Sequence, residues 1–168
     1  QSATYSKSIA LVKPRLVENV TGPVNVVLSS DLGVNVTQTG ELGVKDLYVT
    51  AVENFTTKIV AEVRVNFIQD LDWADLTVES TGQKSLFHYP GGITALPGSV
   101  ESTYTMYILK GEGNNVLICP NVTSTSQITP SCEGHQRLIV GNENLSTETI
   151  NGIVYWKVTG LTSTGGES

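Results

Sequence analysis

Three aspartates in one short stretch have the chemistry to bind a hard cation. Asp70, Asp72 and Asp75 come directly after the most regular apolar segment of the chain. Ca²⁺ takes about six to eight oxygen ligands, and a loop at the end of a strand can bend several carboxylates around one ion. The spacing lacks the glycine and the terminal glutamate of an EF-hand loop. Two interpretations stay open: a calcium site, or a solvated acidic loop in which Trp73 covers the core.

Residues that carry most enzymatic chemistry are sparse. The histidines are His88, between Phe87 and Tyr89, and His135, shortly after Cys132. The sequence contains no Gly-x-Ser-x-Gly elbow, no His-Glu-x-x-His motif and no glycine-rich phosphate loop. We therefore expect no enzymatic activity, with no catalytic residue assigned. The alternative is a small hydrolase, which would need one histidine beside an acidic residue and a hydroxyl in a cleft.

Cysteines and glycosylation sequons favour the outside of a cell. A disulfide between Cys119 and Cys132 would close a loop of about 14 residues and stabilise the fold by about 3 kcal/mol. Their spacing does not fit a Cys-x-x-Cys zinc or redox pair, and two reduced cysteines in a cytosolic core remain the alternative. Asn-x-Ser/Thr sequons occur at Asn19, Asn35, Asn54, Asn121 and Asn144. We expect a secreted glycoprotein at the cell surface or in the extracellular space.

Charge and hydropathy exclude several partners. The chain has 168 residues and a net charge of −6, and its ten basic residues are scattered, so we expect no nucleic-acid partner. No apolar run is long enough to cross a bilayer, and no signal-peptide pattern is present.

Either the protein is cytosolic or a leader has been removed so that Gln1 is the mature start. We favour the second interpretation; a piece cut from a longer chain is the alternative.

The pattern of apolar residues predicts an all-β protein: a two-sheet antiparallel sandwich, jelly-roll or immunoglobulin-like, with almost no helix. In the segment 58–69 one face is wholly apolar and should line the core. That face consists of Ile59, Ala61, Val63, Val65 and Phe67. Asn151-Gly152 between two β-rich arms predicts a type I′ hairpin turn. The expected strands are 6–16, 23–29, 34–37, 47–52, 58–69, 76–79, 85–89, 102–109, 116–119, 137–140, 147–150 and 153–159.

Aromatic side chains do not form an obvious sugar platform. Tyr155 and Trp156 are adjacent in a strand and point to opposite faces, so we expect only one of them in the core. A single exposed ring is too little for stacking on a glycan.

The start of the chain carries a strongly β-forming segment. Ile9, Ala10, Leu11 and Val12 form an uncharged run, separated from the next expected strand by turn-forming residues. An apolar strand at a free end is unstable in water unless it pairs. It can fold back as the edge strand of its own domain, or complete a sheet of a neighbouring subunit by donor-strand complementation. Pro14 fits an edge position in either case.

The C-terminal third resembles modules of secreted surface proteins of archaea and uncultivated bacteria. The resemblance covers about fifty residues: the segment Val-Leu-Ile-Cys-Pro-Asn-Val-Thr at 116–123, Thr-Pro-Ser-Cys at 129–132, and Asn-Gly followed by Tyr-Trp-Lys-Val-Thr-Gly-Leu-Thr-Ser-Thr-Gly-Gly at 151–166. The whole chain is similar to β-sandwich subunits of archaeal extracellular filaments and tubules, such as donor-strand pili, threads and cannulae, and to the TasA-like matrix fibre family.

This resemblance implies a particular mode of assembly. In those families the N-terminal strand of one subunit completes the sheet of the next, and some tubule subunits use calcium at their contacts. It would make Ile9, Ala10, Leu11 and Val12 the donated strand, and Asp70, Asp72 and Asp75 calcium ligands. The low Lys and Glu content departs from hyperthermophile proteins.

Taken together, the sequence predicts an extracellular structural subunit with three segments. Residues 1–17 form an N-terminal strand donated to a neighbour, 18–161 form the sandwich, and 162–168 form a flexible tail. Its partners would be copies of itself, with calcium as a cofactor at the contacts and glycans on the surface. The alternative is an adhesive or carbohydrate-binding module of a larger surface protein, in which the N-terminal strand pairs within its own domain.

Overall fold

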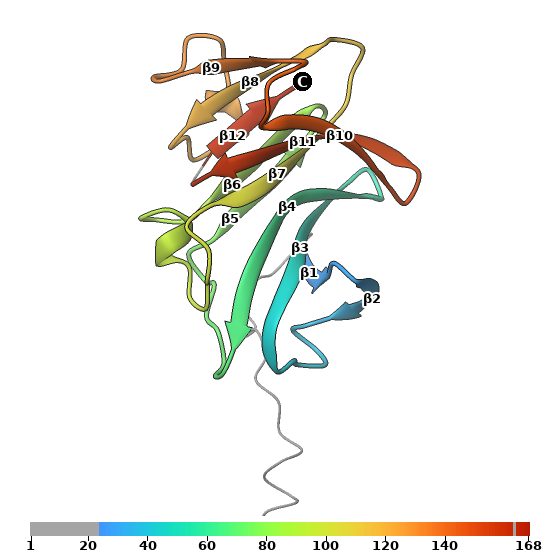
Figure 1. Cartoon of the computed structure of the whole chain (residues 1–168), viewed down its shortest axis with the longest axis vertical. Helices are drawn as coiled ribbons and strands as arrows, with labels where there is room; N and C mark the ends of the chain where they lie inside the picture. The colour runs from blue at the N-terminus through green and yellow to red at the C-terminus, as the bar shows by residue number, and fades with distance from the viewer. Residues whose placement is uncertain (1–23, 163) are drawn as a thin grey trace, which may run out of the picture.

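A computed structural model describes residues 24–162 and 164–168, and these form two packed antiparallel β-sheets (Figure 1). The predicted all-β sandwich is therefore confirmed. Within the described residues, helix is limited to two short 3₁₀ turns, η1 (Ile93–Ala95) and η2 (Thr125–Gln127).

The larger sheet has seven strands in the order β10-β11-β7-β4-β3-β1-β2. Their bounds are β1 (Val24–Leu28), β2 (Asp31–Asn35), β3 (Gly43–Glu53), β4 (Thr56–Phe67), β7 (Tyr104–Leu109), β10 (Leu145–Ile150) and β11 (Ile153–Leu161). The smaller sheet has five strands in the order β5-β6-β12-β8-β9. They are β5 (Thr77–Thr81), β6 (Lys84–His88), β8 (Asn115–Pro120), β9 (Gln136–Ile139) and β12 (Thr164–Glu167). Each strand expected after residue 23 overlaps one of these.

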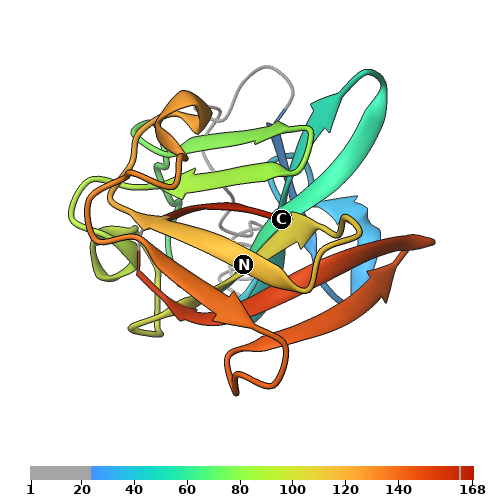
Figure 2. The same cartoon turned by 90° about the horizontal axis from the view of Figure 1, so that it is seen from above.

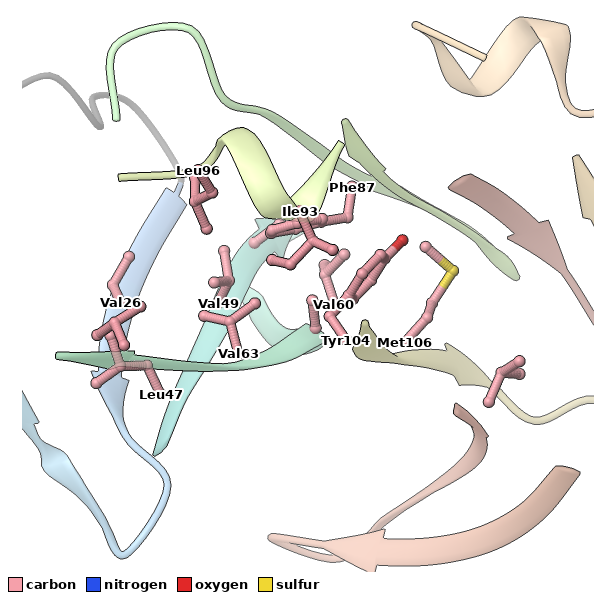
Figure 3. Packing of buried hydrophobic residues seen from close by; sticks show 14 of the residues in the cluster. Val26, Leu47, Val49, Val60, Val63, Phe87, Ile93, Leu96, Tyr104 and Met106 are labelled. Carbon is pink, nitrogen blue, oxygen red and sulfur yellow. The ribbon is translucent and has the colours of Figure 1, made fainter. Parts of the chain in front are cut away.

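The main hydrophobic core lies between the sheets (Figure 3). It contains the inward-facing side chains of the long strands β3 and β4, with Phe87 from the smaller sheet and Ile93 and Leu96 from the η1 region. Trp73, predicted to cover the core, is fully buried, and its indole N–H donates to the Pro97 carbonyl at 2.9 Å. Burial of these aliphatic and aromatic surfaces is the main force that holds the two sheets together.

A bulge in β4 changes which face each side chain occupies. Val49 pairs with Ala61 and Thr50 pairs with Ile59, so Val60 is an extra residue on β4. From Ala61 to Phe67 the alternation predicted from the sequence is correct. Before the bulge it is inverted, because one inserted residue reverses the side-chain period: Val60 faces the core between the sheets, whereas Ile59 packs on the outer face.

The end of the chain is a central strand and not the flexible tail predicted for residues 162–168. β12 pairs with β6 on one side and with β8 on the other. Ser168 is also fixed: its N–H donates to the Gln83 carbonyl at 3.1 Å, and its hydroxyl accepts from the Trp156 indole at 3.1 Å and from the Gly111 N–H at 2.9 Å. The two glycines, Gly165 and Gly166, allow neighbouring side chains to pack closely against β12 and do not make this segment flexible.

Close packing at Gly165 explains the glycine. A Cβ on this residue would lie 2.7 Å from Ile128 and 2.8 Å from Val122, closer than side chains tolerate. Gly165→Val should therefore lower the free energy of unfolding by about 1–3 kcal/mol through overpacking. Gly113→Val is the matched control, since a Cβ there meets nothing within 4 Å, and it should change stability by less than about 0.5 kcal/mol. Urea titration followed by tryptophan fluorescence measures both. Equal stabilities of the two variants would contradict this account of β12.

Candidate functional site

The outer face of the seven-stranded sheet carries a second hydrophobic cluster. Tyr48, Ile59, Tyr107 and Tyr155 are buried there, although this face points away from the smaller sheet. Four partly buried aliphatic residues pack around them: Val27, Leu32, Ile150 and Ile153. β4 is thus buried on both faces where it crosses this cluster, which explains the uninterrupted apolar run Ile59-Val60-Ala61 within it.

A cleft of about 380 Å³ opens beside this cluster, and we call it the outer cleft. Its lining comes from both ends of the sheet, because the β1–β2 end and the β10–β11 hairpin lie on the same side of the molecule (Figures 1 and 2). The lining residues are Asn25, Val27, Leu32, Asn35, Thr50, Thr57, Ile59, Ile150, Asn151, Ile153 and Tyr155. None of them is charged, so the cleft suits an uncharged, partly apolar group.

The Tyr155 hydroxyl resolves a problem created by the β4 bulge. The Ile59 N–H, next to the inserted residue, donates to the Tyr155 hydroxyl at 3.0 Å in a buried position. A buried N–H without an acceptor would be costly.

The expectation that only one of Tyr155 and Trp156 is buried was wrong: Trp156 lies between the sheets, and Tyr155 lies in the outer cluster. The prediction that this pair forms no exposed aromatic platform agrees with the burial of both rings.

Electrostatics keep the tyrosines neutral. Burial raises the pKa of Tyr155, and burial together with the Glu62 carboxylate raises the pKa values of Tyr48 and Tyr107. The Tyr107 hydroxyl donates to Glu62 at 3.4 Å. Burial and the charge of Asp46 raise the pKa of Glu62 above its ordinary value. The cluster behind the outer cleft therefore holds protonated phenols at neutral pH.

A second hollow runs along the free edge of β5, and we call it the side groove. It measures about 420 Å³ and is lined by all of residues 76–81, with Val24 from β1 and Ala51 and Val52 from β3. β5 pairs only with β6, so its other edge is unpaired within the described sheets. Leu76, Val78 and Val24 pack against the main core but remain partly exposed. The side groove is thus an open flank of the sandwich beside an edge strand.

The predicted calcium ligands lie in the loop after β4, on either side of the buried Leu71 and Trp73. Asp70, Asp72 and Asp75 are all exposed, and the Asp72 carboxylate accepts the Ala74 N–H at 2.9 Å. Within the described part of the chain, no three His, Cys, Asp or Glu side chains are placed to share a metal ion. Calcium binding stays a prediction of the sequence.

The predicted disulfide is present. Cys119 and Cys132 are bonded, with their Cα atoms 5.9 Å apart. The segment between them packs Val122 and Ile128 on Leu86 and Leu117, on the outer face of the smaller sheet. The disulfide therefore pins a loop that covers a third hydrophobic cluster.

The sequons differ in their surroundings. Asn54, Asn121 and Asn144 are exposed. Asn35 lies in the outer cleft, where its carboxamide oxygen accepts the Thr37 N–H at 2.9 Å and the Thr37 hydroxyl at 2.5 Å. Asn19 lies outside the described residues, as do Ile9, Ala10, Leu11 and Val12.

The histidines lie in separate places. His88 borders a hollow with Tyr89, Thr94 and Thr162, and no acidic side chain lines that hollow. His135 is exposed beside the disulfide loop, where its Nδ1 lies 3.0 Å from the Cys132 carbonyl. The described residues thus do not bring either histidine together with both partners of a hydrolytic triad in the same hollow.

No helix among the described residues is long and apolar enough to span a membrane. Comparisons of the chain with models of protein families, with curated proteins and with solved structures find no match.

The hydrogen bond under the outer cleft gives a direct test. Tyr155→Phe keeps the ring but removes the acceptor of the buried Ile59 N–H. We expect the free energy of unfolding to fall by about 1–3 kcal/mol. Tyr89→Phe, at a partly exposed ring, is the control and should cost less than about 0.5 kcal/mol. Chemical denaturation measures both; a Tyr155→Phe variant as stable as the parent would show that this bond does not support the bulge.

Proposed function

We propose that this protein is an extracellular structural subunit that polymerises into a filament or tube by donor-strand complementation. The donor segment, Ile9, Ala10, Leu11 and Val12, would leave its own molecule and pair with the free edge of β5 in the next copy. The observation that carries the proposal is the side groove, because it joins an unpaired strand edge to partly exposed core residues over the whole length of β5.

Backbone chemistry supports β5 as the acceptor. An extended segment that adds to a sheet edge gains main-chain hydrogen bonds along its length, and pockets for alternate side chains give specificity. On a strand, Ile9 and Leu11 face one way while Ala10 and Val12 face the other. One of these apolar pairs would enter the side groove beside Leu76 and Val78. The smaller sheet would then have six strands facing the seven of the larger sheet.

The position of β1 leaves the donor segment enough chain to reach another molecule. β1 starts at Val24, which itself lines the side groove, and eleven residues, 13–23, connect it with Val12, the last residue of the donor segment. Fully extended, a connection of this length would reach about 40 Å. That reach is enough to enter a neighbouring copy, and pairing within the same molecule is the competing outcome.

The Cys119–Cys132 disulfide is compatible with an oxidising, extracellular setting.

The proposal includes calcium at the subunit contacts, bound by Asp70, Asp72 and Asp75. The described part of one chain gathers no three acidic, histidine or cysteine side chains for a metal, and in this proposal a second copy supplies the remaining oxygen ligands.

Engineered cysteines can separate exchange from self-pairing. A chain carrying Ala10→Cys and Ser80→Cys should form covalent multimers under mild oxidation, seen as a ladder on a non-reducing gel. A chain carrying Ala10→Cys and Ser146→Cys is the matched control, since Ser146 lies on β10 in the other sheet, and it should give no ladder.

Deletion of residues 1–13 should abolish filaments in electron micrographs while the sandwich stays folded by circular dichroism. Truncated protein that still polymerises would refute strand donation. A bond formed only within one molecule, with the full chain monomeric in light scattering, would favour the adhesive or carbohydrate-binding module instead.

The proposed glycan coat has its own expected pattern. Glycopeptide mapping of protein secreted from cultured eukaryotic cells should find glycans at Asn121 and Asn144, which are exposed. Asn54 is exposed as well, but a glycan there would stand beside the exposed ring of Phe55. Asn35 should stay bare, because its Nδ2, the atom that would carry the glycan, points to Asn25 Oδ1 at 3.5 Å inside the outer cleft. A fully occupied Asn35 with a folded protein would contradict this assignment.

A further inference from the structure

Phe55 is exposed in a way that the fold of one molecule does not explain. Of the three phenylalanines, Phe67 and Phe87 are buried, whereas Phe55 has a relative exposure of 104%. It lies in the turn between β3 and β4, at the tip of the longest hairpin. A lone aromatic ring held fully in water is unfavourable, and the loops that carry such rings are common binding elements.

The backbone at this turn is also unfavourable. Asn54 has φ of 51° and Phe55 has φ of 63°, both in the left-handed region. Asparagine adopts this conformation readily, but a bulky side chain rarely does, and glycine is the usual residue at the second position of such a turn. The molecule therefore keeps a strained backbone and an exposed ring at the same residue, which is typical of a contact site.

Hydrogen bonds from the β5–β6 turn hold the residues on both sides of this turn in place, so the position of the Phe55 backbone is fixed. The Glu53 carboxylate accepts from Lys58 Nζ at 2.7 Å and from the Gly82 N–H at 2.9 Å. Lys58 Nζ also donates to the Gly82 carbonyl at 3.3 Å. These bonds tie both strands of the hairpin to the β5–β6 turn.

The outer cleft has the properties of a receptor for such a ring. It is uncharged, it has room for an aromatic side chain, and aliphatic groups from Leu32, Ile150 and Ile153 border it. Thr57, two residues after Phe55, lines the same cleft, so the hairpin tip lies near its rim. The β3–β4 tip and the β10–β11 tip project on the same side of the molecule (Figures 1 and 2).

We propose that Phe55 of one copy inserts into the outer cleft of a second copy. Because the ring and the cleft lie on the same side, two copies can exchange rings reciprocally around a two-fold axis. The ring gains an apolar environment, and the uncharged lining means that no ion has to be desolvated. This contact uses none of the donor segment, so it stands independently of strand donation.

Photocrosslinking tests the contact in the full-length protein, produced without N-glycosylation because a glycan on Asn54 would stand beside the ring. p-Benzoylphenylalanine in place of Phe55 keeps an aromatic group at the tip. A mixture of normal and heavy-isotope-labelled copies identifies cross-links between molecules by mass spectrometry. We expect such cross-links to peptides that contain Leu32 or Ile150 and Ile153. The same probe in place of Ile139, which is 61% exposed on the smaller sheet, is the control and should not reach these peptides.

A second measurement separates contact from folding. Phe55→Gly and Phe55→Ala should each weaken the association of copies about tenfold or more by sedimentation analysis. Phe55→Gly should also have a higher melting temperature than Phe55→Ala, because glycine adopts the left-handed conformation without strain. Ile139→Ala should associate like the parent.

No cross-link between copies, cross-links only to other surfaces, or unchanged association of both Phe55 variants would overturn the proposal. Failure of the Ala10 and Ser80 cysteine pair to form a ladder would leave it intact, so the two proposals fail separately.

Discussion

The hydrogen bond between the Ile59 N–H and the Tyr155 hydroxyl is the constraint on which the rest of the larger sheet depends. It joins residues far apart in the chain, from β4 and β11, and it makes the insertion of Val60 possible in a buried place. The bulge turns Ile59 to the outer face, where it packs with three tyrosines. Bulges increase strand twist and bend the strand that carries them. The β4 bulge therefore contributes to the bend that brings both ends of the sheet around the outer cleft, together with the register shifts between β1 and β2 and between β11 and β7.

The smaller sheet depends on a different constraint, the close approach of β12 to its neighbours. Its two internal glycines allow a four-residue strand to fill the centre of the sheet, between β6 and β8. Without β12 the sheet would be two separate hairpins, and an isolated two-stranded hairpin is marginal in water. The disulfide loop then covers the outer side of the sheet over Gly165. Order in the last residues of the chain is thus required for one half of the sandwich.

The sequence was sufficient for the class of fold, because alternation of apolar residues along β4, turn residues such as Asn151-Gly152 and the scarcity of helical periodicity all agree. It was not sufficient for the outer cluster. Tyr48 and Tyr107 alternate with core residues and so look like solvent-facing positions, and only the curl of the sheet buries them. The bulge at Val60 leaves no composition signal, since Val60 and Ile59 are both apolar. β12 was missed because a glycine-rich segment usually indicates a flexible chain. In this strand the glycines are required because neighbouring side chains leave no space for a Cβ atom. Phe55 could have been flagged, since Asn-Phe stands where Asn-Gly is usual in a hairpin turn.

The low charge of the chain bears on how its open edges behave. Proteins protect edge strands with lysine, proline or inward-facing charge. β5 reads Thr-Val-Glu-Ser-Thr, and its single charged residue, Glu79, is already engaged, since its carboxylate accepts the Thr125 N–H at 2.9 Å. β10, one of the two edge strands of the larger sheet, has Glu148 paired with Lys157 at 3.2 Å. At both strands the carboxylate is thus held by contacts within the fold, and Glu79 keeps its negative charge because an amide N–H does not neutralise it. β5 therefore lacks the lysine or proline that commonly protects an edge strand, and its backbone edge stays open beside the side groove.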